Sequence, residues 1–239
     1  MALARIRLEC AGDLNRQVRD QQSLMTQHEF ERTIVAWDEV ETMRGQLYAR
    51  ALRIITQGFA TEAHLLILAT WNFARFRYVV PSFNLADYER RLQNIRADIR
   101  DLTPCDIATV DLNGHRKTII DAFNSLAAMK GVERTGAAKA LHLLLPGVFV
   151  MWDAAIAGWH SPKADYRRLK IIQSGFWNPP TYPFAKSGAG YHDFLVYCQS
   201  RFGLFASPAK DKTLAKCIDE FNYCTIAKAL PTRKKAQAS

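Results

Sequence analysis

An apolar stretch that ends in a carboxylate is the first place where this sequence could carry out chemistry. The run GVFVMW, residues 147–152, leads directly into Asp153. An acid in this position could cap a following helix, a contribution on the order of 1 kcal/mol. It could also lie as a catalytic group in a wall of low dielectric constant, where its electric field is strong. The two roles are compatible, because a cap position orients the carboxylate.

A glycine turn and a helix of small residues precede this acid. Gly131 and Val132 are expected to form a tight turn, and the next helix runs over 134–145 before a proline ends it. The first N–H groups of a helix lack partners within the helix, so this turn and Arg134 could hold a phosphate. The small side chains from Gly136 onward allow close approach of either a nucleic-acid strand or a neighbouring helix.

Three polar residues lie on one face of that helix. Thr135, Lys139 and His142 are spaced four and then three residues apart, so they point in one direction. They are candidate accessory groups for Asp153. Packing or phosphate binding is the alternative role for Lys139.

Composition and charge narrow the class of protein. The chain has 239 residues, a net charge of +9 and 49% hydrophobic residues, enough for a packed core. The positive charge suits a polyanionic partner, although a basic surface without such a partner is the alternative. We find no leader sequence and no apolar run that could span a membrane. The five cysteines are scattered without metal-ligand spacing, so we expect a cytoplasmic protein with no metal and no cofactor.

Helical periodicity dominates the elements that must position these residues. We find no clear alternation of apolar and polar residues, and GVFVMW is the best candidate for a strand. We therefore expect an all-α fold, with a long Pro/Gly-rich loop over 175–190. The expected helices cover 28–57, 60–76, 84–100, 115–129, 134–145, 163–173, 188–201 and 209–228.

The order of these features resembles the helix-hairpin-helix superfamily of DNA glycosylases. In that superfamily a hairpin Gly–Val, a helix, a Gly/Pro-rich loop and a catalytic aspartate follow one another. Here Gly131, Val132, the helix 134–145, the loop 146–147 and Asp153 have that order.

A second stretch supports the resemblance. TWNFARF, residues 70–76, is similar to the NNIARI segment with which the 8-oxoguanine branch fills the gap left by a flipped base. By this likeness Asn72 enters or borders the duplex and Arg75 contacts the base left unpaired. The alternative is that the aromatic residues of the stretch are core and the two polar residues are incidental.

The resemblance implies two helical lobes with a cleft between them. Residues 45–147 would form a helical barrel lobe that ends in the helix-hairpin-helix. Residues 1–44 and 148–239 would form the second lobe, with a basic C-terminal tail. The likeness is strongest to a divergent branch that includes phage thymine-hypermodification proteins and phage-defence glycosylases.

The implied activity is removal of a modified base from double-stranded DNA by a monomer. Asp153 would stabilise the positive charge that builds up on the deoxyribose. Trp71 and Trp152 would supply stacking faces for the flipped base. Thr135 stands where bifunctional members carry a nucleophilic lysine, so we expect no strand cleavage. The long loop 175–190 leads us to expect a bulky, hypermodified base.

Two other readings stay open at this stage. A base-hypermodifying enzyme of the same fold would act on a thymine derivative with a second substrate. A non-catalytic DNA-binding module would use Asp153 only as a cap. The biological setting, phage defence or repair, also stays open.

Overall fold

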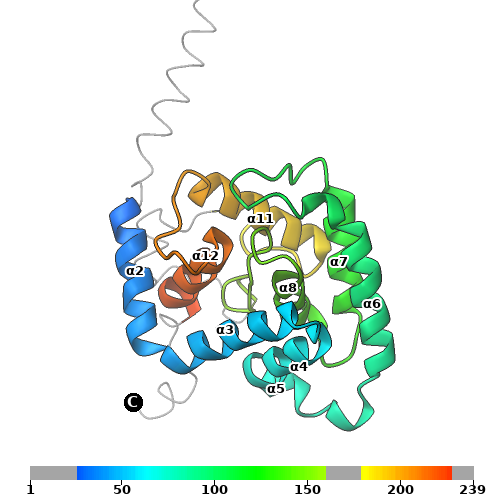
Figure 1. Cartoon of the computed structure of the whole chain (residues 1–239). Coiled ribbons are helices and arrows are strands. Elements are labelled where there is room, and N and C mark those ends of the chain that lie inside the picture. The colour runs from blue at the N-terminus through cyan, green and yellow to red at the C-terminus, as the bar shows by residue number, and fades with distance from the viewer. Residues whose placement is uncertain (1–25, 160–178, 228–239) are drawn as a thin grey trace, which may run out of the picture.

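Helices form every regular element of the residues that the structure describes. The computed structural model describes residues 26–159 and 179–227, and within them no strand occurs (Figure 1). The expected all-α class is therefore confirmed. None of the described helices is both long and apolar enough to cross a membrane.

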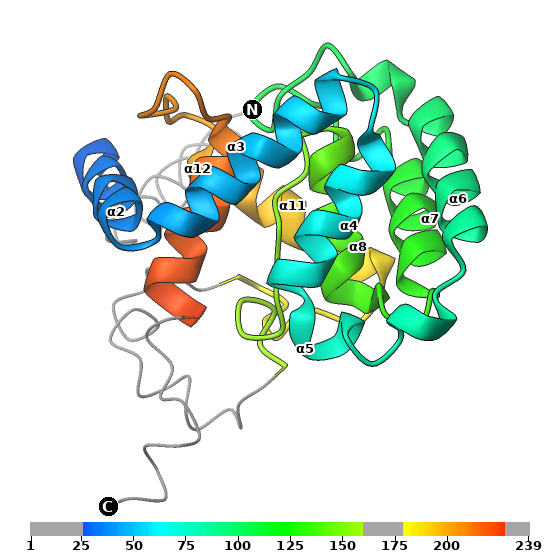
Figure 2. The same cartoon turned by 60° about the horizontal axis from the view of Figure 1, so that its bottom comes forward.

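The first expected helix is divided in two. α2 (Gln27–Val40) begins at a capping box in which Thr26 and Glu29 bond reciprocally, and α3 (Thr42–Thr56) follows after Glu41. Glu41 has φ −108° and ψ 38°, outside the helical region. The break lets α2 pack against α12 (Leu214–Asn222) while α3 packs against α4 (Ala60–Trp71), two directions that one straight helix could not follow (Figure 2).

The expected helix 60–76 is also interrupted. α4 (Ala60–Trp71) ends at Asn72, and the short α5 (Phe73–Phe76) and a 3₁₀ turn η1 (Val80–Ser82) follow. The Asn72 side chain donates hydrogen bonds to the carbonyl oxygens of the hairpin after α7, which fixes the chain at this corner.

The next three expected helices occur with small changes at their ends. α6 (Leu85–Asp98) leads through a 3₁₀ turn, η2 (Arg100–Leu102), to α7 (Arg116–Ala127). α8 (Glu133–Leu144) then forms the centre of the molecule in both views, with residues 136–143 all buried (Figures 1 and 2). A run of small and apolar residues is what such an enclosed helix requires.

Two further helices complete the described chain. α11 (Gly188–Phe202) matches its expected range, and it packs against α7. α12 (Leu214–Asn222) begins later than expected because the Thr213 side chain caps it there, and a π-helical turn, η3 (Tyr223–Ala227), continues it. The expected helix 163–173 and the first part of the loop 175–190 lie outside the described residues.

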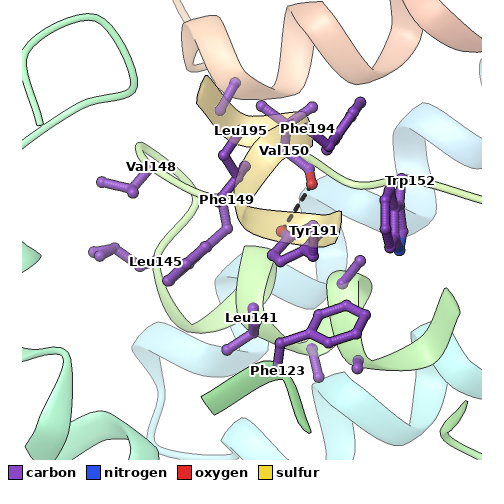
Figure 3. Close-up of a cluster of buried hydrophobic side chains, with 14 of the residues drawn as sticks. Phe123, Leu141, Leu145, Val148, Phe149, Val150, Trp152, Tyr191, Phe194 and Leu195 are labelled. Carbon is purple, nitrogen blue, oxygen red and sulfur yellow. Dashed lines mark hydrogen bonds between the residues drawn. The ribbon is translucent and has the colours of Figure 1, made fainter. Parts of the chain in front are cut away.

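The apolar run before Asp153 is an extended segment but not a strand. Its backbone carbonyls accept bonds from several elements: Gly147 O from Ile107 N at 2.8 Å, Phe149 O from His142 Nδ1 at 2.5 Å and Val150 O from Tyr191 Oη at 2.9 Å. Figure 3 shows the bond between Tyr191 and Val150. Pro146 O, just before the run, accepts from Thr213 Oγ1 at 2.6 Å. These bonds replace those of a sheet, which explains why an extended apolar run occurs without strand pairing.

The hydrophobic core runs through both of the predicted lobes. One cluster of buried side chains reaches from Phe30 on α2 through Phe123 on α7 to Phe194 on α11 and Phe221 on α12. Trp152 lies in this cluster, in edge contact with Phe123 and Tyr191 (Figure 3). The division into lobes over 45–147 and over 1–44 with 148–239 stays a prediction.

Candidate functional site

A cavity of about 150 Å³ lies where segments from both predicted lobes meet. An engineered apolar cavity of about this volume holds benzene, so the space suits one aromatic ring. Its walls combine aromatic rings with charged groups. The lining residues are Trp37, Arg44, Thr70, Trp71, Thr135, Lys139, Met151, Trp152, Asp153, Ile156, Asp219 and Tyr223.

Asp153 lines this cavity at the end of the extended segment 147–152, whose carbonyl groups are held by hydrogen bonds. Its Oδ1 accepts hydrogen bonds from the backbone N–H groups of Ala155 and Ile156, each at 2.8 Å. The residues after it form successive turns and no helix, so the carboxylate caps a turn. Oδ2 has no hydrogen-bond donor among the described residues. One oxygen thus fixes the orientation of the carboxylate and the other remains available to a ligand.

Lys139 enters the same cavity from α8 and is only 7% exposed. Burial lowers the pKa of its amine, and the nearby carboxylates of Asp153 and Asp219 oppose that change. Within the described part of the chain it forms no hydrogen bond and no ion pair within 4.0 Å. Its amine is therefore a donor, or when neutral a base, that no described residue occupies.

The N-terminus of α8 lies at the edge of this cavity through Thr135. The N–H groups of Val132 and Glu133 both bond to Met129 O, inside the hairpin turn. Those of Arg134 and Thr135 have no acceptor in the described residues, as is usual at a helix start. The Arg134 side chain is exposed and donates from Nε to Lys186 O at 2.7 Å.

Unlike Lys139, the buried lysine of α12 is closely paired with carboxylates. The residues involved were not identified from the sequence. Lys216 Nζ lies 2.8 Å from Asp219 Oδ2 and 3.4 Å from Glu220 Oε1. Its ammonium also lies over the rings of Tyr48, Trp71 and Trp37, at 4.9, 5.0 and 5.6 Å from their centroids. Lys216 is 1% exposed, so this cage encloses the charge. The spacing of Lys216, Asp219 and Glu220, three and four residues apart, was the signal available in the sequence.

Arg44 and Tyr223 form another part of the lining that the sequence did not reveal. Arg44 donates to Tyr223 Oη at 2.6 Å, lies over its ring at 5.1 Å, and pairs with Glu41 at 3.6 Å. The break between α2 and α3 gives this arginine its place, so no local pattern could predict it.

His142 lies behind the cavity and not in its lining. Its Nδ1 bonds to Phe149 O at 2.5 Å, which requires the N–H form there, so Nε2 accepts from Tyr48 Oη at 2.7 Å. Burial lowers the pKa of His142 to about 4. The residue thus fixes the segment that carries Asp153, a structural role in place of the expected accessory one.

Several residues expected at the DNA are packed inside the protein. Asn72 is 6% exposed, and its Nδ2 donates to Gly131 O at 3.0 Å and Val132 O at 3.3 Å. Val132 is fully buried. A Cβ on Gly136 would lie 3.0 Å from Leu68 Cδ2, so this glycine serves helix packing. Gly131 has φ +91°, and a Cβ there would collide with Val79. These contacts support structural roles for the four residues, and the expected role of Asn72 at the duplex stays a prediction.

Exposed aromatic residues lie beside Asn72 instead. Phe73 and Tyr78 are 53% and 70% exposed, and the guanidinium of Arg77 lies over both rings, at 5.1 and 4.5 Å. We call Phe73, Arg77 and Tyr78 the α5 cluster. Trp71, two residues before Phe73, lines the cavity, so cavity and cluster meet at the end of α4. Arg75 belongs to α5, but its side chain lies outside what the structure describes.

Comparison with known proteins gives no further identification. No family model matches the chain, and neither the curated proteins nor the solved structures contain a match. Among the described residues, no group of three or more His, Cys, Asp or Glu side chains could hold a metal ion. The site must therefore be interpreted from its own geometry.

Proposed function

We propose that this protein is a monofunctional DNA glycosylase that hydrolyses the N-glycosidic bond of a modified base held in the Asp153 cavity. The observation that carries the proposal is the meeting of Asp153, Lys139, Thr135, Trp71 and Trp152 around one space. These residues come from separate parts of the sequence, and each was expected at the site before the structure was considered.

The proposed mechanism relies on the oriented carboxylate of Asp153. As the base departs, positive charge develops on the deoxyribose, and the free Oδ2 stabilises that charge or orients a water molecule. The two N–H bonds to Oδ1 hold the group in place, so little reorganisation accompanies the reaction. The aromatic lining supplies stacking faces for the extruded base.

The proposed contact with DNA combines the α8 N-terminus with the α5 cluster. The unpaired N–H groups of Arg134 and Thr135 suit a phosphate. The exposed rings of Phe73 and Tyr78, with Arg77 between them, suit unstacked bases. This surface takes over the wedge role that the sequence assigned to Asn72.

The size of the cavity limits the proposed substrate. A volume of about 150 Å³ suits a single ring, so a bulky substituent would have to extend beyond the cavity. The expectation of a bulky base rested on the loop 175–190, of which only the part from residue 179 is described. We therefore propose a modified base without requiring a bulky one.

Base release and strand cleavage test this proposal separately. The protein is incubated with duplexes that carry one modified base, and each sample is analysed before and after hot alkali. Strand breaks only after alkali are expected. Breaks before alkali would contradict the monofunctional assignment, and no breaks at all would contradict glycosylase activity on that duplex.

Lys139 provides an amine that could act as the nucleophile of a bifunctional enzyme, so the monofunctional assignment needs its own test. A buried amine of lowered pKa beside the sugar could attack C1′ and form a Schiff base. Borohydride would trap such an adduct on the DNA. We expect no trapped adduct in the wild-type protein, with Lys139→Met as the matched control. An adduct that Lys139→Met abolishes would identify a lyase activity.

A non-catalytic DNA-binding module is the second candidate, and the turn-capping bonds of Asp153 favour it. In that case the wild type would release no base from any duplex, and Asp153→Asn would leave DNA binding unchanged. A base-hypermodifying enzyme would retain the base in the DNA, so mass spectrometry of the released and retained bases separates it from a glycosylase.

A further inference from the structure

We infer that Asp219 selects the ligand of the cavity and that it favours a single ring with an exocyclic amino group, as in a cytosine-type base. The inference rests on the proposed function, because only that function makes the ligand a nucleobase, and it concerns the same cavity. Asp219 had no role in the sequence-based interpretation. It comes from α12, which contributes no other residue to the lining.

The orientation of Asp219 is fixed from behind by a buried cation. Its Oδ2 lies 2.8 Å from Lys216 Nζ, and its side chain is 15% exposed. Lys216 is itself held in the cage of Trp37, Tyr48 and Trp71. A lysine so enclosed cannot follow a moving carboxylate, and Lys216 therefore acts as a positioning residue. Oδ1 of Asp219 has no donor in the described part of the chain and is available to a ligand.

The charge of this pair determines what the free oxygen can recognise. A carboxylate paired with an ammonium accepts hydrogen bonds and has no proton to donate. It therefore attracts an amino group and repels a carbonyl oxygen in the same position. Cytosine presents the N4 amino group where uracil and thymine present O4, and Asp or Glu is the usual partner of N4.

The volume of the cavity and the remaining polar groups agree with this choice. A space of about 150 Å³ accommodates one ring. Lys139 is a donor in the same lining without a partner among the described residues, and it complements the acceptor atoms of a cytosine ring. Trp37, Trp71 and Trp152 also line this space, so aromatic surface borders such a ligand.

Binding of free nucleosides to the full chain tests the inference without any need for catalysis. Deoxycytidine and deoxyuridine are titrated to millimolar concentration, and quenching of the tryptophan fluorescence is followed, with calorimetry as a second readout. One good hydrogen-bonded contact discriminates by about 1–3 kcal/mol. We expect deoxycytidine to bind about tenfold more tightly than deoxyuridine.

Asp219→Asn should remove this preference, because an amide can donate to O4 as readily as it accepts from N4. The ratio is expected to fall below about twofold. Asp121→Asn is the matched control, since Asp121 also pairs with a lysine on a helix, Lys117, but lies outside the cavity. The control should keep the tenfold ratio.

The outcomes separate this inference from the proposed function. Equal binding of the two nucleosides, a preference for deoxyuridine or no saturable binding by the wild type would overturn the role of Asp219, even if Asp219→Asn fails to fold. An unchanged ratio in a folded Asp219→Asn would do the same. A preference that depends on Asp219, without base release from any duplex, would support the inference and refute the glycosylase.

Discussion

Two walls of the cavity treat a buried lysine in opposite ways. On α12, Lys216 contacts two carboxylates and three aromatic rings. On α8, Lys139 is nearly as buried but has no ion pair or hydrogen bond within the described residues. On the α12 wall the lysine is fully partnered and only Asp219 Oδ1 lacks a donor among the described residues, whereas on the α8 wall the lysine itself has no such partner.

The difference indicates where the molecule is built for stability and where it is prepared for a ligand. Burial of a charge costs free energy that partners must offset. Lys216 has those partners, so its removal should leave the carboxylate of Asp219 without its cation and the carboxylate of Glu220 with Lys212 alone, at 2.9 Å. The cost at Lys139 is not offset in this way, a pattern more typical of functional sites than of structural ones.

The largest effect is expected for Lys216→Met, which tests the paired lysine and should lower the free energy of unfolding by about 3–5 kcal/mol. Glu220 is fully buried, and burial already raises the pKa of its carboxyl. Loss of the cation would make its ionised form still less favourable. Urea denaturation at pH 7 measures the change, and a loss below about 1 kcal/mol would mean that the cage is not an energetic unit.

A second variant addresses the ligand side of the α8 wall. Asp153→Asn keeps an oxygen for the N–H groups of Ala155 and Ile156, so the turn and the stability should be preserved. Loss of the negative charge should lower the rate of base release by about 10²- to 10³-fold. Single-turnover assays on a substrate duplex measure the rate. Equal rates in the two proteins would show that Asp153 is only a cap.

His142, which lies behind the α8 wall, should make the stability of the fold depend on pH. The folded-state pKa of His142 is lowered to about 4, from an ordinary 6.5. The unfolded chain therefore takes up a proton between these values while the folded protein does not. Stability should fall as the pH decreases from about 6.5 to 4, by about 3 kcal/mol for this residue.

The measurement is the free energy of unfolding at several pH values in wild type and in His142→Gln. His64, whose pKa burial lowers to about 3, adds a second contribution of the same sign that both proteins share. The variant should therefore show a shallower pH dependence. Parallel curves would mean that His142 does not couple protonation to folding.

A smaller effect is expected at the α5 cluster, outside the cavity. Replacement of Phe73 or Tyr78 by Ala should weaken DNA binding by about 1–3 kcal/mol per base that loses its stacking partner. Both rings are exposed, so stability should hardly change. Fluorescence anisotropy with a duplex at fixed salt measures the affinity. The fully exposed Leu204, replaced by Ala, is the control and should have no effect.

The smallest expected effect completes the comparison of the two lysines. Lys139→Met replaces a charge without an ion partner in the described residues by an apolar chain of similar length. The free energy of unfolding should stay the same or rise by about 1 kcal/mol. Denaturation beside Lys216→Met tests the contrast directly. Comparable losses in the two variants would remove the distinction between the two walls.

The sequence predicted much of the local structure, and its errors have specific physical causes. The ranges of α6, α7, α8 and α11 follow from hydrophobic periodicity and were anticipated closely. The breaks at Glu41 and Asn72 were missed, because each depends on the direction in which the chain must continue. GVFVMW had the composition of a strand, but His142 of α8, Tyr191 of α11 and the backbone N–H of Ile107 satisfy three of its carbonyl groups.

The residues of the candidate site also differ in whether the sequence could predict their position. Asp153, Lys139 and Thr135 could be selected from the sequence because a helix period and a chain break define their positions. The burial of Asn72 could not be predicted, since its partners lie on the distant hairpin of Gly131 and Val132. The α5 cluster was overlooked because the sequence does not show which aromatic residues remain exposed.

The sequence by itself determined the helical class, the extent of most helices, the positive charge and the acid that ends an apolar run. Those properties depend on neighbouring residues, whose periodicity and chain breaks are visible in one dimension. Only the tertiary structure decided that Asp219 and Arg44 line the same cavity as Asp153, and that Asn72 is buried against the hairpin of Gly131 and Val132. The physical reason is that partners of buried charges and polar groups are selected by packing between distant segments, which no local pattern records.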